Sequence, residues 1–229
     1  MNKKAVVLLS GGLDSATALY FAKAKGYKTS CLVFDYGQKH KKEIIRAKKI
    51  AKLSGSPCRV VNFRLPWKGS SLIDKTKRIP ERGIAEISSV AFPDGILPST
   101  YVPARNTIFL SFALSMAETI KAQAIFIGAN ALDFSGYPDC RPKYFRAWAN
   151  LVKSLGLSSG NKNIKIIAPL VRMTKAQIIR LGRRLGVPYR LTWSCYAGGK
   201  TPCMKCDSCK LRQKGFRELK LHDPIFKNL

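Results

Sequence analysis

The stretch Ser-Gly-Gly-Leu-Asp-Ser at residues 10–15 constrains the fold of this chain more than any other. It follows the apolar run 5–9, which predicts a buried strand, and precedes the apolar run 18–22, which predicts a helix. A glycine turn at a helix N-terminus exposes backbone N–H groups where the helix dipole favours negative charge. No Gly-Lys-Ser/Thr follows, so this is not the Walker spacing. We predict an anion site; the alternative is a plain strand–turn–helix corner.

The remaining pattern predicts an α/β fold. Further apolar runs predict strands at 30–34, 59–63, 124–128 and 164–169. Helical patterns alternate with these strands, and that alternation predicts a parallel sheet with right-handed crossovers and helices on both faces. The helices are expected at 39–53, 105–121, 142–155, 174–186 and from about residue 210.

Two of these segments carry further expectations. The outer face of the helix at 39–53 is basic, with Glu43 as its single acid. Residues 66–103 are interrupted by prolines and glycines, which predicts a long loop that is either a lid over the nucleotide site or a surface excursion. Thr174 and Gln177 have the spacing of a capping box at the start of a helix.

Length and composition limit the class of protein. The 229 residues suffice for one large domain, alone or with a small appendage. No apolar run approaches the ~20 residues of a membrane span, and the N-terminus lacks the pattern of a signal sequence. A cytoplasmic location is therefore expected.

The net charge of +28, from 41 basic and 13 acidic side chains, is extreme. Such a field attracts nucleic acid, nucleotides and acidic membranes. The lysines are scattered along the chain and form no tail, which favours a general basic bias over a dedicated binding arm. Nucleic acid is thus an allowed partner but not a required one.

Polar groups follow three of the predicted strands. They are the loop 10–17, residues 35–38 and residues 129–141, and in an open parallel sheet the carboxyl ends of the strands meet at one crevice. Asp14 suits a Mg²⁺ bridge or a structural hydrogen bond. Asp35 could accept a hydrogen bond from a ribose hydroxyl or an adenine amine, or could cap a helix.

The loop 133–141 is the most distinctive of these segments. It holds Asp133, Asp139 and Arg141, and the helix start upstream holds Arg105 and Asn106. One carboxylate can accept from the ring N–H and the exocyclic amine of a guanine-like base, and an arginine suits a substrate carboxylate. The alternative is a proline/glycine turn with helix caps.

The seven cysteines predict a metal site in a reducing compartment rather than a disulfide framework. Cys31 and Cys58 lie in apolar runs and are expected in the core. The only histidines, His40 and His222, neighbour no nucleophile motif and are expected on the surface. An iron–sulfur run would need a further cysteine before a proline, so structural Zn²⁺ is favoured. The four expected ligands are Cys195, Cys203, Cys206 and Cys209.

Several strings occur together in a fixed order: Ser-Gly-Gly-Leu-Asp-Ser-Ala-Thr, Phe-Asp-Tyr-Gly-Gln-Lys-His, Val-Pro-Ala-Arg-Asn, Asp-Phe-Ser-Gly-Tyr-Pro-Asp-Cys-Arg-Pro, and Trp-Ser-Cys-Tyr with Cys-x2-Cys-x2-Cys. Over nearly its whole length the chain resembles the QueC family of 7-cyano-7-deazaguanine synthases, within the N-type ATP pyrophosphatases (PP-loop). The first string is common to many ATP pyrophosphatases, and the last two narrow the resemblance to this family. Ala104 departs from it, because the family usually has Gly there.

The resemblance implies an adenine nucleotide α-hydrolase-like fold and ATP-dependent conversion of 7-carboxy-7-deazaguanine and ammonia to a nitrile, in queuosine or archaeosine precursor biosynthesis. Free ammonia is the implied nitrogen source, because no glutaminase motif is present. The resemblance also implies one structural zinc on the four cysteines, Mg²⁺ with ATP, and a homodimer. Residues 1–190 would form the nucleotide-binding domain and 191–229 a zinc-binding segment packed on it.

The site residues follow from the matching motifs and from the chemistry above. Arg105, Asn106, Asp133, Asp139 and Arg141 would serve the substrate. The alternative function is a tRNA-modifying PP-loop ATP pyrophosphatase, although such enzymes normally carry an added RNA-binding domain or a catalytic cysteine pair, and neither is evident. The expected ATP-binding residues are Leu9, Ser10, Gly11, Gly12, Leu13, Asp14, Ser15, Ala16, Thr17, Ala18, Leu19 and Asp35.

Overall fold

The computed structural model describes the chain except residues 1–2, 40, 89–96, 132–136, 156–163 and 227–229. It has an α/β fold, as predicted. The strands are β1 (Lys3–Leu8), β2 (Tyr27–Asp35), β3 (Cys58–Asn62), β4 (Ala124–Ile127) and β5 (Lys165–Ile167). The helices are α1 (Leu13–Ala24), α2 (Lys42–Leu53), α3 (Ile84–Ser88), α4 (Arg105–Thr119), α5 (Pro142–Ser154), α6 (Lys175–Arg184) and α7 (Asp207–Glu218). Short 3-10 turns are η2 (Pro138–Cys140), η3 (Tyr189–Leu191) and η4 (Pro224–Phe226).

The five strands form one parallel sheet in the order β3-β2-β1-β4-β5. Val7 of β1 is in register with Cys31 of β2 on one side and with Phe126 of β4 on the other. The chain builds outward from β1 to β3 and then returns to add β4 on the opposite side. This reversal of strand order beside β1 opens a crevice at the carboxyl ends of β1 and β4, which is where ligands bind in such sheets.

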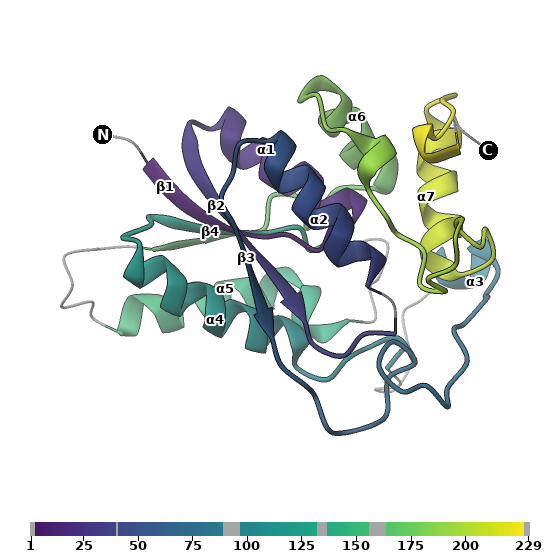
Figure 1. The fold of residues 1–229 in the computed structure, drawn as a ribbon, viewed down its shortest axis with the longest axis horizontal. Coiled ribbons are helices and arrows are strands. Elements are labelled where there is room, and N and C mark those ends of the chain that lie inside the picture. The colour runs from purple at the N-terminus through teal and green to yellow at the C-terminus, as the bar shows by residue number, and fades with distance from the viewer. Residues whose placement is uncertain (1–2, 40, 89–96, 132–136, 156–163, 227–229) are drawn as a thin grey trace.

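Helices cover both faces of the sheet (Figure 1). Alternate residues of β1 point to opposite faces, so Val7 packs in the core under α1, α2 and α6, and Val6 in the core under α4 and α5. Each fully buried aliphatic side chain of this kind stabilises the fold by roughly 1.5 to 3 kcal/mol. Cys31 is fully buried and Cys58 half-buried, in agreement with their predicted place in the core.

Two helix starts follow from local signals in the sequence. The predicted capping box of α6 is present, since the Gln177 backbone N–H donates to Thr174 Oγ1 over 3.2 Å and the Thr174 N–H donates to Gln177 Oε1 over 2.8 Å. α1 begins at Leu13, ahead of its apolar run, because Gly12 is its N-cap. The glycine turn therefore leads directly into a helix.

The segment 66–103 is attached to the rest of the molecule at several points. It contains the short helix α3, and Ser70 and Ser71 are fully buried. Arg82 donates to the buried carboxylate of Asp207 at the start of α7, with an N–O distance of 2.6 Å. Movement of this segment as a lid remains a prediction. Within the described parts of the chain, no helix is long and apolar enough to cross a membrane.

Candidate active site

A pocket opens at the reversal point of the sheet, beside the ends of β1 and β4. Segments far apart in the sequence contribute to it. Its lining includes Ser10, Gly12, Asp14 and Ser15 of the glycine loop, Gly128, Ala129 and Asn130 after β4, Arg105 and Asn106 of α4, and Trp193, Ser194 and Tyr196 near the cysteines. The crevice predicted from the topology is therefore present.

The glycine loop leaves backbone donors available at the N-terminus of α1. Gly12, the N-cap, has no side chain and makes no side-chain cap hydrogen bond to the first turn of α1. The hydroxyls of Ser10 and Ser15 lie 3.0 Å apart, and the Ser15 hydroxyl donates to the Gly12 carbonyl over 3.2 Å. This arrangement of N–H groups, hydroxyls and a helix N-terminus suits a phosphate group.

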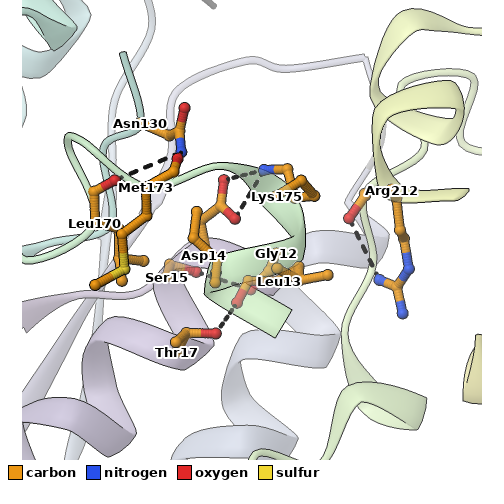
Figure 2. A network of polar contacts seen from close by, with 12 residues as sticks. Gly12, Leu13, Asp14, Ser15, Thr17, Asn130, Leu170, Met173, Lys175 and Arg212 are labelled. Carbon is orange, nitrogen blue, oxygen red and sulfur yellow. Dashed lines mark hydrogen bonds and ion pairs between the residues drawn. The ribbon is translucent and has the colours of Figure 1, made fainter. Parts of the chain in front are cut away.

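Asp14 forms an ion pair with Lys175 across the pocket (Figure 2). Lys175 Nζ lies 2.9 and 2.8 Å from the two carboxylate oxygens, and its side chain is 9% exposed. The backbone of α7 approaches Lys175 so closely at Gly215 that a Cβ there would lie 2.6 Å from Lys175 Cγ. Sequence reasoning used this segment only as a helix cap and missed Lys175; its position directly after the Thr174 cap was the available signal.

Asn130 connects the loop after β4 to the segment before α6. Its side-chain amide donates to the Met173 carbonyl over 2.5 Å and contacts the Leu170 carbonyl at 3.5 Å (Figure 2). Gly128 of the same loop lies against α1, because a Cβ there would be 2.7 Å from Ser15 Cα. These contacts fix the loop after β4 against the glycine loop.

Arg105 and Asn106 line the pocket, whereas Asp139 lies outside its lining and holds the start of α4. Asp139 is buried and accepts a hydrogen bond from the Asn106 backbone N–H over 3.1 Å, at the N-terminus of α4. The Arg105 guanidinium donates to the Tyr36 hydroxyl over 3.3 Å. Burial raises the pKa of Asp139, and Arg105 opposes that rise. Ala104, the N-cap of α4, has φ of +52°, a left-handed conformation that glycine adopts without strain.

The other predicted substrate residues lie elsewhere. Asp139 is not among the residues that line the pocket, and Arg141 is exposed at the N-cap of α5. Asp133 is outside the described residues. The predictions for these side chains stay predictions.

Asp35 is held by basic side chains outside the pocket lining. Its oxygens lie 2.9 Å from Lys41 Nζ and 3.3 Å from Arg64 Nη1, and the hydrogen bond from Lys41 is the main cause that lowers the pKa of Asp35. Its neighbours Phe34 and Tyr36 line the pocket instead, because successive side chains of a strand point to opposite faces.

The later residues of the predicted ATP segment also face away from the pocket. Ala16, Thr17, Ala18 and Leu19 are buried in α1 and do not line it. Gly11 likewise packs under α2, and Thr17 accepts or donates a hydrogen bond with the Tyr189 hydroxyl over 2.9 Å. The segment therefore contacts the pocket only through its first half, at Leu9, Ser10, Gly12, Leu13, Asp14 and Ser15.

Glu43 corrects one prediction. The helical pattern predicts it on the outer, basic face of its helix, but in the structure it lines the pocket from the first turn of α2. Burial raises the pKa of Glu43 to about 7, although the positive charge of Arg105 acts in the opposite direction. The pattern places it outward because that pattern records which residues face the sheet, whereas the first turn of α2 lies against the glycine loop at Gly11. His222 is exposed, as predicted, and His40 is outside the described residues.

The four predicted cysteine ligands lie together. Their Sγ atoms are all within 4.8 Å of one another, and Cys203 Sγ and Cys209 Sγ are 4.0 Å apart. A tetrahedral metal with bonds of about 2.3 Å to sulfur separates its ligands by about 3.8 Å. Backbone N–H groups of Cys203 and Cys206 donate to Cys195 Sγ and Cys203 Sγ over 3.3 Å, which favours thiolates. The donor set therefore fits a closed metal site.

The cluster borders the pocket. Trp193, two residues before Cys195, is 1% exposed, and its backbone N–H donates to the Gly11 carbonyl over 2.9 Å. Its indole N–H donates to the Cys195 carbonyl over 2.9 Å. Through this residue the cysteine cluster supports the glycine loop.

Comparisons with known proteins give the family of this chain. A family model described as "Queuosine biosynthesis protein QueC" matches residues 4–220. The chain belongs to the QueC family. A 7-cyano-7-deazaguanine synthase of Trichodesmium erythraeum is 52% identical over 97% of this chain and 99% of the relative. One from Thermoplasma acidophilum is 50% identical over 98% of this chain and 92% of the relative.

A solved structure, the U34-tRNA thiolase NcsA from Methanococcus maripaludis, is similar over 96% of this chain and 67% of its own, with 19% identity and a TM-score of 0.49. The sequence match assigns the QueC family. The match extends from the glycine loop to the cysteine cluster, so the pocket and the metal site both lie within the length that the family model covers.

Proposed function

We propose that this protein is an ATP-dependent 7-cyano-7-deazaguanine synthase of queuosine precursor biosynthesis. About half of its residues are identical to those of curated synthases along almost the entire length of both chains, and this observation carries the proposal. The pocket supports it, because its lining includes the glycine loop, which is suited to phosphate, and also Arg105 and Asn106.

The proposed chemistry converts a carboxylate to a nitrile in two activations. ATP first transfers AMP to the carboxylate oxygen of 7-carboxy-7-deazaguanine and releases pyrophosphate. Ammonia displaces AMP to give the amide. A second ATP transfers AMP to the amide oxygen, and loss of AMP with a proton leaves the nitrile. The contribution of the protein is mainly positioning and stabilisation of developing charge.

Each side of the pocket suits one part of this reaction. The N–H groups at the α1 N-terminus and the hydroxyls of Ser10 and Ser15 would hold the pyrophosphate that leaves. Arg105 would contact the carboxylate or the base of the substrate from the opposite side. Asp139 would act by fixing the start of α4, and direct contact of Asp133 or Arg141 with the base remains part of the proposal.

Two metals belong to the proposal. Zn²⁺ suits the four cysteines, which present four sulfur ligands and no open position, so its role would be structural. Mg²⁺ would enter with ATP: both oxygens of Asp14 already contact Lys175, so phosphate oxygens would supply most of its ligands. Mg²⁺ would neutralise charge on the phosphates.

The proposal also includes a homodimer, a cytoplasmic location, and a division into a nucleotide-binding domain (1–190) and a zinc-binding segment (191–229). An apolar surface beside the edge strand β3 supports the dimer. Phe112, 41% exposed on α4, stacks there on Phe63, with ring centroids 5.7 Å apart. Analytical ultracentrifugation of the wild type and of Phe112→Glu would test it, and a monomeric wild type would contradict it.

One assay tests the main proposal. The protein is incubated with ATP, Mg²⁺, ammonium and 7-carboxy-7-deazaguanine, and products are followed by mass spectrometry. The expected result is the nitrile, with two AMP released for each nitrile formed. AMP release that depends on added RNA, with no nitrile, would instead favour a tRNA-modifying pyrophosphatase.

A further inference from the structure

Glu43 is a pocket carboxylate with no assigned role. It is the second residue of α2, and its backbone lies directly under the glycine loop, because a Cβ on Gly11 would be 2.3 Å from the Glu43 carbonyl oxygen. Its side chain is half-buried and lines the pocket together with Arg105, Tyr36 and Tyr196. Glu43 therefore lies between the proposed phosphate site and the proposed substrate site.

Within the part of the chain that the structure describes, Glu43 differs from the other carboxylates around the pocket in having no partner. Among the described residues, Asp14 is the other acid in the lining, and both of its oxygens contact Lys175. Asp139 accepts from the α4 N-terminus, and Asp35 is paired with Lys41 and Arg64. Among the described residues, no hydrogen bond or ion pair engages the Glu43 carboxylate. A carboxylate left open toward a pocket is available to a cationic ligand.

The charged groups that the structure describes near Glu43 act on it from a distance and form no ion pair with it. The groups that act on it electrostatically are Arg105 from α4 and Cys195 from the metal segment, and Tyr36 and Tyr196 are in turn affected by it. A helix N-terminus and an arginine both favour an ionised glutamate. Burial nevertheless raises its pKa to about 7. A group that exchanges its proton near neutral pH is suited to act as a base.

The proposed reaction needs such a group. Ammonia in water at neutral pH is almost entirely ammonium, which has no lone pair to attack carbon. A cation must therefore be attracted into a pocket that already contains Arg105 and Lys175, and must lose a proton there. Glu43 is the one described pocket carboxylate whose oxygens are not already occupied by a side chain or backbone donor.

We propose that Glu43 binds the ammonium ion and takes its proton as the nitrogen attacks the activated carboxyl carbon. This rests on the proposed function. One N–H bond of ammonium breaks and its proton goes to the Glu43 carboxylate, while its electron pair forms the new N–C bond. The C–O bond to AMP breaks, AMP leaves with that electron pair, and a second proton passes from the nitrogen to solvent. The product is the neutral amide.

The test uses the full-length protein and its Glu43→Gln variant, which keeps the shape and removes the charge. Ammonium-dependent amide and nitrile formation should fall by about 10² to 10⁴-fold, with a higher KM for ammonium. Carboxylate-dependent exchange of pyrophosphate into ATP, which needs no ammonium, should stay within a few-fold of the wild type. Hydroxylamine is already uncharged at neutral pH, so the variant should form the hydroxamate at close to the wild-type rate.

Two further variants serve as controls. Glu118→Gln removes one carboxylate from α4 outside the pocket lining and should match the wild type in all assays. Glu43→Asp should recover part of the ammonium reaction. Equal loss of the ammonium and hydroxylamine reactions in Glu43→Gln would assign Glu43 a structural role, and an unchanged ammonium reaction would also overturn the proposal. A wild-type protein that forms neither nitrile nor hydroxamate would overturn the proposed function itself.

Discussion

Gly11 occupies a position that the surrounding backbone reserves for glycine. Its φ is +84°, and a Cβ there would lie 2.3 Å from the Glu43 carbonyl oxygen and 2.8 Å from the Ala47 nitrogen. Both are backbone atoms of α2, which cannot rotate away as the end of a side chain can. Gly26 has a similar φ of +80°, but a Cβ there would meet no atom within 4 Å. A side chain at Gly26 would therefore cause backbone strain alone, whereas one at Gly11 would also clash with α2.

Gly11→Ala should therefore destabilise the protein by roughly 2 to 4 kcal/mol, and Gly26→Ala by about 1 kcal/mol. The difference is the cost of moving α2 away from the loop. Urea denaturation of both variants measures it. Equal losses of unfolding free energy in the two variants would contradict the prediction, because they would mean that α2 can move away from residue 11 without cost.

The protonation of Glu43 should appear in the pH dependence of stability. An unfolded glutamate titrates near 4.5 and folded Glu43 at about 7. Between these values the folded state binds more protons than the unfolded state, so this residue lowers stability as pH rises from about 4.5 to 7, and the loss is complete above 7.

Glu43→Gln should then be more stable than the wild type at pH 8, by about 1 to 3 kcal/mol, and equal to it at pH 4.5. The measurement is urea denaturation at both pH values, with Glu118→Gln as the control that follows the wild type. A variant whose advantage is greater at pH 4.5 than at pH 8 would have the wrong sign and would contradict a raised pKa.

At the scale of elements, the segment that holds the four clustered cysteines contacts the pocket and also joins the C-terminal part of the chain to the rest of the molecule. Trp193 connects Cys195 to the Gly11 carbonyl, and Asp207, next to Cys206, binds Arg82 of the segment before α3. Arg212 of α7 forms a buried ion pair with Asp223, with its Nε 2.5 Å from a carboxylate oxygen. Loss of the metal should loosen α7 and the pocket wall together.

Cys206→Ser should lower bound zinc and expose Trp193, because three thiolates hold the metal less firmly than four. We expect a red shift of tryptophan fluorescence and at least about tenfold weaker ATP binding, read by calorimetry, with zinc measured by mass spectrometry. Cys58→Ser, in β3 and outside the cluster, is the control and should keep its zinc. Normal ATP binding in a variant without zinc would show that the cysteine cluster does not support the ATP site, and would contradict the prediction.

Elements whose signals are local could be predicted from the sequence. The apolar runs marked all five strands, the Thr174 capping box marked α6, and the cysteine spacing marked the metal cluster. Glu43 and Lys175 could not be recognised in this way. Each reaches the pocket only because its helix starts beside the glycine loop. That placement depends on contacts of α2 with Gly11 and of α6 with α1, between segments far apart in the sequence.

At the scale of the whole molecule, the charge distribution goes beyond what the pocket needs. Several acidic side chains form ion pairs within the molecule: Asp14, Asp35, Asp207 and Asp223 each contact a lysine or arginine. With 41 basic and 13 acidic residues in all, the surface that remains is strongly positive. Such a surface binds polyanions without sequence preference, through release of counterions.

We therefore expect transfer RNA to bind this protein, with a Kd of about 10⁻⁴ to 10⁻⁶ M near physiological salt. The affinity should be higher at low salt and should fall steeply as the salt concentration rises. Nitrile synthesis should continue unchanged at a salt concentration that releases the RNA. The basic pocket residues Arg105 and Lys175 already contact Tyr36 and Asp14 inside the pocket, so they do not form part of the surface that binds RNA. Fluorescence anisotropy measures binding, with an uncharged peptide nucleic acid of the same length as the control. Nitrile formation that stops when RNA is removed would make RNA part of the reaction, and the positive surface would then belong to the active enzyme rather than to a general basic bias.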